Sequence, residues 1–515
     1  MSFRSILLAG TVAGLGLTAT APAFAAKPSQ QSEIDELKAE VQALKAEVQG
    51  LKGQQQTTQA QAVATQEKVD TAVAAVAKVT PPKGKKGLQI GAVTVTPGGF
   101  IEAAGIYRNK NQASDVGQNF NGVPFGNSSN DHLSETRFTA RQSRLSLLAT
   151  ADIDPTTHAG AYYEMDFLGA AGTANSKESN SYNLRIRNIY GTVDWDDLGL
   201  HLLAGQSWSL ATLYSSGLMP RQEDVPLTID AQYVVGFNWT RQPGVRIVKD
   251  FDKKLWLGLS VENAQTTQTG SFPSGAGNQN NSGAQGGGLF DTDTGSVVYT
   301  NDAGPDIIAK AAWEPGWGHY EIYGIARFFR DRANFQNKTD IGGGVGAGAI
   351  LPVIPKMLDF QVSGLVGQGI GRYGAGQLPD VTYGPDGSTH PLTEYQIMAG
   401  VIGHPNPSLD IYGYAGLEHA DRWSVPGVSG YGYGNPLSSN AGCATEGSSL
   451  TCTGNTRDLM EGTAGFWWKF YQGDFGSVRF GAQYEYVARN VWGGVGGGGT
   501  VDNNIVYTSF RYYPF

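Results

Sequence analysis

The sequence predicts an all-β transmembrane barrel of about 16 antiparallel strands, preceded by a short periplasmic α-helical coiled coil. Val478 to Arg489 alternates apolar and polar residues over a length that suits a tilted transmembrane strand of roughly 9 to 11 residues. Met460 to Phe470 repeats the pattern. Since hydrocarbon offers no hydrogen bonds, a sheet that spans it must close on itself, with polar side chains lining a lumen.

Composition supports this fold class. Only 16% of the residues are charged, and the chain has 71 glycines, 23 tyrosines and 10 tryptophans, which suits strands, tight turns and interfacial aromatic girdles. No internal run of about 18 apolar residues occurs, which excludes a helical membrane protein. The formal net charge of −9 argues against a nucleic-acid partner.

The beginning of the chain reads as an export signal. Arg4 precedes an apolar stretch from Ile6 to Leu17, and Ala23-Phe24-Ala25 gives the small-x-small cleavage pattern. A membrane anchor is the alternative, but the apolar core is too short for it. We therefore expect a signal peptide at 1–25, a stalk at 26–80, a linker at 81–98 and the barrel at 99–515.

A regular heptad pattern follows the signal. Glutamates at g and lysines at e allow pairing between parallel chains, whereas a single solvated helix would leave the apolar seam unshielded. The seam predicts self-association, although it leaves open whether the coil has two or three strands. Its residues are Ile34, Leu37, Val41, Leu44, Val48 and Leu51.

We expect sixteen strands from about Gly99 onward, from Phe100 to Arg108 at the start to Asn504 to Phe515 at the end. Short turns alternate with long loops, as in bacterial outer-membrane barrels, and an even strand number places both barrel ends in the periplasm. The stretch from Phe138 to Ala151 is expected to be continuous. The phase of the last strand stays open, because Arg511 lies in phase with Phe515.

Cys443 and Cys452 are the only cysteines. In an oxidising compartment this pair predicts one disulfide in a surface loop. No histidine or further cysteine stands at metal-ligand spacing, so we expect no metal site.

Charged residues on the predicted inner faces form the candidate selectivity set. The cations would guide carboxylates through the lumen, or they would pair with Glu164, Asp166, Glu321 and Glu485 and brace the wall; we expect both. The proposed pore-lining residues are Arg144, Arg185, Arg187, Arg246, Lys310, Arg327, Arg479, Glu164 and Asp166.

The long connection from Ser207 to Thr240 has the position of a loop that folds inward and narrows the pore, with a plain surface loop as the alternative. It carries Arg221, Glu223, Asp224 and Asp230. No nucleophile arrangement, phosphate-binding glycine loop or other catalytic motif was found, so we expect neither an enzyme nor a cofactor.

Several short runs also resemble the DcaP-like family of outer-membrane porins. They are Ala140 to Leu145, Tyr163 to Phe167, Ala204 to Gln206 and Arg241 to Arg246. The resemblance implies a homotrimer of 16-stranded barrels with periplasmic coiled coils, passing small anions such as dicarboxylates.

The expected function is a passive diffusion porin in the outer membrane, in contact with its lipid and preferring small anionic solutes. The alternative from another class is a structural or adhesive trimer whose barrel only anchors the outer loops. Conductance in a planar bilayer discriminates between the two.

Overall fold

The structure is a computed structural model that describes residues 87–169, 182–269, 300 and 302–515. The expected signal peptide and coiled-coil stalk lie outside the described residues. Among the described residues, no helix is both long enough and apolar enough to cross a membrane.

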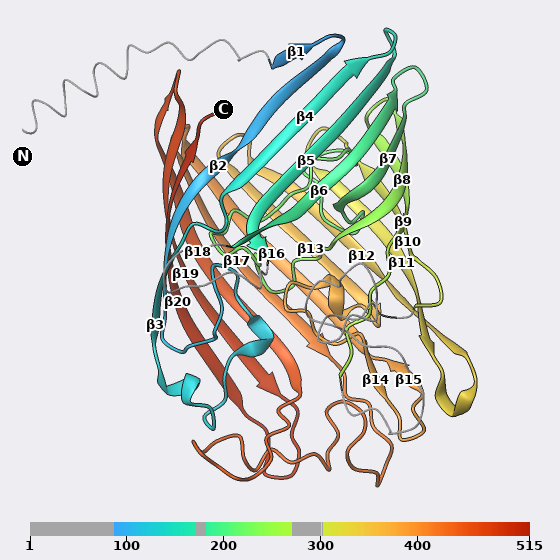
Figure 1. The fold of residues 1–515 in the computed structure, drawn as a ribbon, viewed down its shortest axis with the longest axis vertical. Coiled ribbons are helices and arrows are strands. Elements are labelled where there is room, and N and C mark those ends of the chain that lie inside the picture. The colour runs from blue at the N-terminus through green and yellow to red at the C-terminus, as the bar shows by residue number, and fades with distance from the viewer. Residues whose placement is uncertain (1–86, 170–181, 270–299, 301) are drawn as a thin grey trace, which may run out of the picture. The chain divides into compact units, whose positions relative to one another are not determined.

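The wall is a single antiparallel sheet that curves round on itself (Figure 1). Its strands are β2 (Val93–Arg108), β3 (Glu135–Thr139), β4 (Arg144–Asp152), β5 (Thr157–Gly169), β6 (Asn183–Trp195), β7 (Leu200–Trp208), β8 (Arg241–Phe251), β9 (Leu255–Glu262), β10 (Asp306–Trp313), β11 (His319–Asp331), β12 (Lys338–Ile354), β13 (Leu358–Gln368), β16 (Thr393–Asn406), β17 (Leu409–Ala420), β18 (Thr456–Gly473), β19 (Gly476–Val491) and β20 (Thr500–Tyr513).

The first and last wall strands close the barrel. β2 pairs with β20, with Ile101 opposite Tyr512. β3 and β4 both pair with β2 and share one position in the wall. The short β1 (Leu88–Ile90) only adds a hairpin to the start of β2. The closed barrel therefore has 16 strand positions, and the predicted fold class is confirmed for the barrel.

Several strand boundaries differ from the prediction, and two of the differences concern the start of the barrel. β2 begins at Val93, within the stretch expected to be a linker. The expected strand from Phe138 to Ala151 is interrupted at 140–143. There the Ser143 hydroxyl accepts from the Glu102 backbone N–H at 2.9 Å and donates to the Ala140 carbonyl at 2.7 Å, so a side chain replaces ladder bonds and alternation alone could not reveal the break.

Alternation along β19 follows the predicted phase. Tyr484 and Tyr486 are exposed on the outer face, whereas Gln483 and Glu485 are buried on the inner face. Other wall strands expose aliphatic side chains such as Val245, Ile247, Leu257, Leu259, Ile322, Ile397 and Ile411. An apolar exterior of this kind suits contact with hydrocarbon.

The phase of the last strand is settled by its partner. Phe510 is exposed on the outer face, and the Arg511 guanidinium points inward, where its Nε donates to Glu102 at 2.8 Å. β20 ends at Tyr513, so Phe515 lies beyond the strand and need not share the phase of Arg511.

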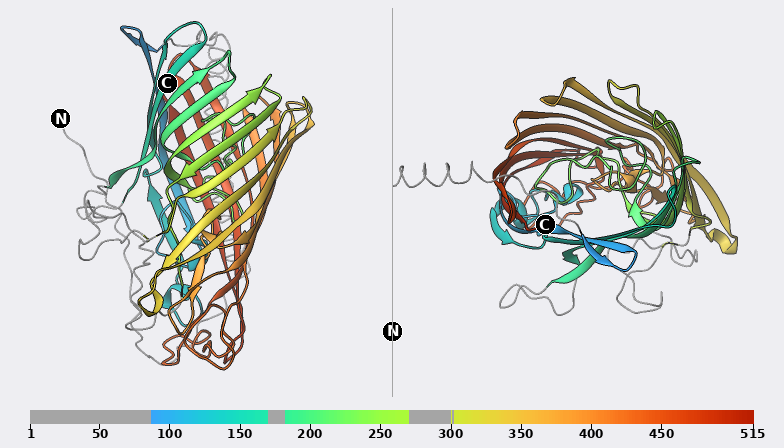
Figure 2. Two further views of the ribbon diagram at one scale, coloured as in Figure 1. Left: turned by 90° about the vertical axis from the view of Figure 1, so that its right-hand side faces the viewer. Right: turned by 90° about the horizontal axis from the view of Figure 1, so that it is seen from above.

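Among the described residues, several connections between wall strands reach into the barrel, and two of them form the segments on which the site is built. Residues 209–240, between β7 and β8, are the first inward segment, and residues 369–392, between β13 and β16, are the second. The second contains the hairpin of β14 (Val381–Tyr383) and β15 (Thr389–Pro391) and the 3-10 turn η4 (Gly371–Tyr373). Viewed along the barrel, the green first segment lies within the ring of strands (Figure 2).

Further 3-10 turns lie in other connections at the end of the barrel from which the two inward segments leave the wall (Figure 1). They are η1 (Phe120–Gly122), η2 (Ser129–His132) and η3 (Ala333–Phe335).

Candidate functional site

The first inward segment crosses the lumen from the wall that bears its ends to the opposite wall. It leaves β7 and returns to β8, which are neighbours in the sheet. Near its start, Lys310 on β10 donates to the Thr212 carbonyl at 2.7 Å. Farther along, Trp467 on β18 donates its indole N–H to the Leu227 carbonyl at 2.7 Å. The segment is thus hydrogen-bonded to strands on both sides of the barrel.

The second inward segment packs against the first. The Trp239 N–H donates to the Tyr373 carbonyl at 2.8 Å, and the Ala375 N–H donates to the Phe237 carbonyl at 3.1 Å. No inward fold was predicted for the second segment, because its glycine-rich and polar composition is that of an outer loop. Together the segments fill much of the lumen with buried side chains.

Two predicted arginines on β6 hold the two predicted carboxylates on β5. Arg185 binds Asp166 with both prongs, at 3.0 and 2.7 Å. Arg187 lies 2.5 Å from Glu164 and 3.1 Å from Asp166, and it also donates to the Tyr233 hydroxyl at 3.2 Å. Because Tyr233 belongs to the first inward segment, this cluster ties the segment to the wall.

Two further arginines at the same cluster have no carboxylate partner among the described residues. Arg144 on β4 lies over the Phe100 ring at 5.3 Å. Arg241 lies over the rings of Trp208 and Trp239 at 4.9 and 5.0 Å. The wall from β4 to β8 therefore brings four guanidinium groups against two carboxylates, which leaves a net positive charge. We call this set the basic cluster; its residues are Arg144, Arg185, Arg187, Arg241, Glu164 and Asp166. Arg241 was missed as a site residue because β8 begins earlier than predicted.

Tyr233 is the phenol at the centre of this basic cluster. It is buried and has a positive φ of 75°. Burial opposes its ionisation, but the surrounding guanidinium groups of Arg187, Arg241 and Arg144 outweigh burial and lower the pKa of Tyr233 to about 8.

The remaining predicted cations lie apart from the cluster. Lys310 pairs with Glu321 at 2.8 Å, and Arg327 pairs with Asp380 at 2.6 Å. Arg246 donates to the Tyr214 hydroxyl and the Trp208 carbonyl. Arg479 lies over the Tyr513 ring at 4.4 Å. Lys310 and Arg327 thus pair with buried carboxylates and brace the interior.

The four charged residues predicted for the constriction have different surroundings. Arg221 is exposed at the tip of the first inward segment, where it lines a cavity of about 330 Å³ together with Asp152, His158 and Tyr162. Burial, reinforced by the Glu321 carboxylate, raises the pKa of Asp224 to about 7.

Glu223 is half-buried and Asp230 is fully buried. Burial raises the pKa of both carboxyls. Asp230 accepts from the backbone N–H groups of Gln118 and Gln232.

Of the four carboxylates expected to pair with lumen cations, Glu485 is the exception. It forms no salt bridge within the described chain and lies among other buried carboxyls on the opposite wall. This wall includes Glu394, Glu418 and Glu461, which accept hydrogen bonds from backbone N–H groups of the inward segments. Their inward phase was readable from alternation, but their partners were not.

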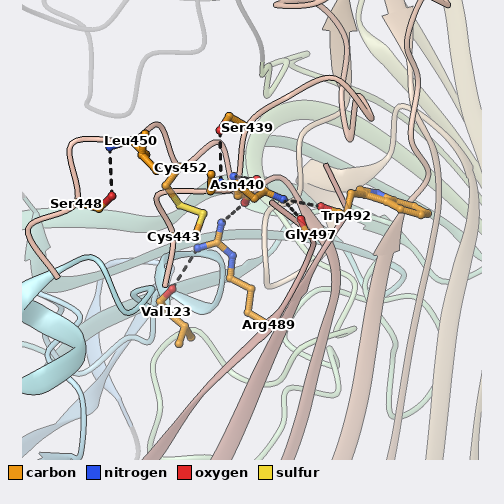
Figure 3. Close-up of a disulfide and its surroundings, with 12 residues drawn as sticks. Val123, Ser439, Asn440, Cys443, Ser448, Leu450, Cys452, Arg489, Trp492 and Gly497 are labelled. Carbon is orange, nitrogen blue, oxygen red and sulfur yellow. Dashed lines mark hydrogen bonds between the residues drawn. A yellow bond between two sulfur atoms is a disulfide. The ribbon is translucent and has the colours of Figure 1, made fainter. Parts of the chain in front are cut away.

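The long-loop end of the barrel carries the disulfide between Cys443 and Cys452 (Figure 3). Beside it, the Arg489 guanidinium donates to the Val123 and Gly454 carbonyls at 3.1 and 2.9 Å. These bonds join two outer loops to β19. Within the described residues, no group of three or more His, Cys, Asp or Glu side chains is placed to hold a metal ion.

No protein-family model matches the sequence, and no curated protein matches it. The fold is similar to the crystal structure of the outer membrane channel DcaP of Acinetobacter baumannii, with a TM-score of 0.59 and 19% identity over 83% of this chain and 100% of that one.

Two further solved structures have TM-scores below 0.5 and add no argument. Salmonella typhi OmpF in complex with daunomycin has a TM-score of 0.46 and 9% identity, covering 82% of this chain and 98% of that one. An anion-selective porin from Comamonas acidovorans has 0.44 and 13%, covering 82% and 99%.

Proposed function

Because this chain has a fold similar to that of the outer membrane channel DcaP, we propose that it is an outer-membrane porin. Small hydrophilic solutes would diffuse through it passively, with a preference for anions. The observation that carries the anion preference is the basic cluster, where four guanidinium groups face two carboxylates beside the first inward segment. Such a cluster attracts anions and repels cations in a narrow, partly dehydrated passage.

Dicarboxylates are the solutes that we propose for this pore. Guanidinium matches carboxylate in a two-pronged geometry. Arg144 and Arg241 supply two guanidinium groups that no carboxylate of the described chain neutralises. A solute with two carboxylates would engage both, and the sequence resemblance to DcaP-like porins supports the same class.

The remaining parts of the proposal concern placement and assembly. The apolar outer face supports insertion in lipid. The export signal supports passage to the outer membrane, and the heptads of Ile34 to Leu51 support self-association through a periplasmic coiled coil. The resemblance to DcaP-like porins supports a homotrimer as the assembly.

Ion current through the purified full-length protein in a planar bilayer tests the proposal. We expect open channels whose reversal potential in a KCl gradient shows anion preference. The double variant Arg144→Gln and Arg241→Gln should shift that potential toward cations. Arg332→Gln is the matched control, because Arg332 is exposed in the outer turn between β11 and β12.

Two results would count against the proposal. A barrel with no ion-permeable state would favour the alternative function, a structural or adhesive protein whose barrel only anchors the outer loops. A reversal potential unchanged by the double variant would remove the basic cluster as its cause.

A further inference from the structure

The wall opposite the basic cluster holds the inward segments through glutamates. On β17, one oxygen of Glu418 accepts from the Gly236 N–H of the first segment and from the Gly376 N–H of the second, each at 2.8 Å. On β18, Glu461 accepts from the Val235 N–H at 2.8 Å. On β16, Glu394 accepts from the Ile370 N–H at 2.7 Å. We call these three residues the glutamate dock.

The dock is withdrawn from water and lacks counter-ions. Glu394, Glu418 and Glu461 are 1%, 0% and 5% exposed. None of them forms a salt bridge in the described chain. The second oxygen of each carboxyl, Oε1 of Glu394, Oε2 of Glu418 and Oε1 of Glu461, has no hydrogen-bond partner among the described residues. An ionised carboxylate in such a place is costly.

Two further buried carboxyls lie where the first segment meets this wall. Asp230 on the first segment and Glu485 on β19 are both 0% exposed, and Oδ2 of Asp230 and Oε1 of Glu485 have no hydrogen-bond partner among the described residues. Two bare carboxylates repel each other in such a place, so ionisation of both is unfavourable. Five buried carboxyls thus gather where the segments meet the wall.

The charged and titratable groups around these carboxyls do not balance them. Arg108 faces Asp230 and Glu485, but it already pairs with Glu135 at 3.2 Å. Arg327 lies near Glu394, but it pairs with Asp306 and Asp380. The facing groups in the described chain include Arg108 on β2, Arg327 on β11, Tyr412 on β17, Tyr507 on β20, Asp230 on the first segment, Asp380 on the second and Tyr433 in the outer loops.

We propose that the glutamate dock positions both inward segments while its carboxyls are protonated, and that their ionisation releases the segments and widens the pore. When the segments leave the wall, water reaches the carboxylates, and Asp230 moves away from the glutamates of the wall. Both changes stabilise the ionised carboxylates, so ionisation favours the released state. The effect on pore width rests on the proposed function, whereas docking and release do not. These glutamates are positioning residues, because they act on solutes only through the segments that they hold.

Hydrogen exchange of the full-length protein in detergent tests the proposal. Peptides that cover 229–238 and 370–378 report on the docked N–H groups of Val235, Gly236 and Gly376. After correction for intrinsic exchange, we expect protection to fall at least about tenfold between pH 6 and pH 9. The double variant Glu418→Gln and Glu461→Gln keeps an acceptor oxygen and cannot ionise, so protection at pH 9 should persist.

Glu446→Gln is the control, since Glu446 is exposed in an outer loop and its loss should leave the wild-type response intact. Equal protection of the wild-type segments at pH 6 and pH 9 would overturn the proposal, and this comparison needs no variant. Loss of protection in a folded double variant as large as in the wild type would overturn it as well.

Exchange does not depend on ion current, so the two proposals fail separately. If the segments are released at high pH but no ion current is seen, the porin function is rejected and the docking proposal stands. If ion current is seen but exchange does not depend on pH, the docking proposal is rejected and the porin function stands.

Discussion

A β-carbon placed on Gly416 would overlap the carbonyl oxygen of Val235. Gly416 belongs to β17, and Val235 belongs to the first inward segment. The segment therefore meets the barrel wall backbone to backbone, at a point where only a residue without a side chain fits. The neighbouring Gly236 N–H is the donor to Glu418, so this contact and the glutamate dock hold the same stretch of chain.

We expect Gly416→Ala to push the first inward segment off the wall. The added methyl group cannot share space with the Val235 carbonyl, and overpacking of this kind costs about 1–3 kcal/mol. Exchange of the Val235 and Gly236 amides should accelerate, and single-channel conductance should rise. Gly462→Ala is the matched control, because nothing lies within 4 Å of the corresponding position. Wild-type exchange in Gly416→Ala would show that the segment is held elsewhere.

We expect Arg187→Ala to destabilise the barrel by about 3 kcal/mol or more, because it removes the partner of two carboxylates in a buried site. Arg187 is buried and binds both Glu164 and Asp166. Arg185→Ala should cost less, since the Arg185 side chain is 36% exposed. Urea-induced unfolding in lipid vesicles measures both. Equal midpoints for the two variants would contradict the structural reading of the cluster.

The sequence was sufficient for the wall and insufficient for what fills it. Lipid outside and polar groups inside impose a period of two, so the phase of Tyr484 and Glu485 followed from alternation. The partners of Glu418 and Glu461 could not be derived, because they are backbone amides supplied by a segment about two hundred residues earlier. The composition of the second segment did not indicate whether it folds into the lumen, since a polar, glycine-rich loop can lie either inside or outside the barrel.

Breaking the disulfide should loosen the outer loop and leave the barrel intact. Cys443 and Cys452 close a small loop, and in the chain-entropy view the cross-link stabilises the folded form of this loop, rather than the barrel, by about 2.5 kcal/mol. The loop is also held by the Asn127 N–H, which donates to the Cys443 carbonyl at 3.0 Å. In the variant Cys443→Ser and Cys452→Ser, limited proteolysis within 442–453 should accelerate while the unfolding midpoint of the barrel stays unchanged. A shifted midpoint would mean that the loop supports the wall.

Tyr233 should make anion preference depend on pH. Its pKa is lowered to about 8 by the guanidinium groups around it, against the effect of burial. Below pH 8 the phenol is neutral, and the basic cluster keeps its full positive charge. As pH rises through 8, the phenolate adds a negative charge beside Arg187, so anion preference should fall.

Reversal potentials at pH 6.5 and pH 9 measure this change, and Tyr233→Phe should remove the part of it due to the phenol. Tyr190→Phe is the control, because it deletes another buried tyrosine hydroxyl and leaves Tyr233 in place. Working in the background of Glu418→Gln and Glu461→Gln keeps the inward segments docked at both pH values. If Tyr233→Phe leaves the pH response of that background unchanged, the phenol does not titrate within the pore and the cluster keeps its charge at both pH values.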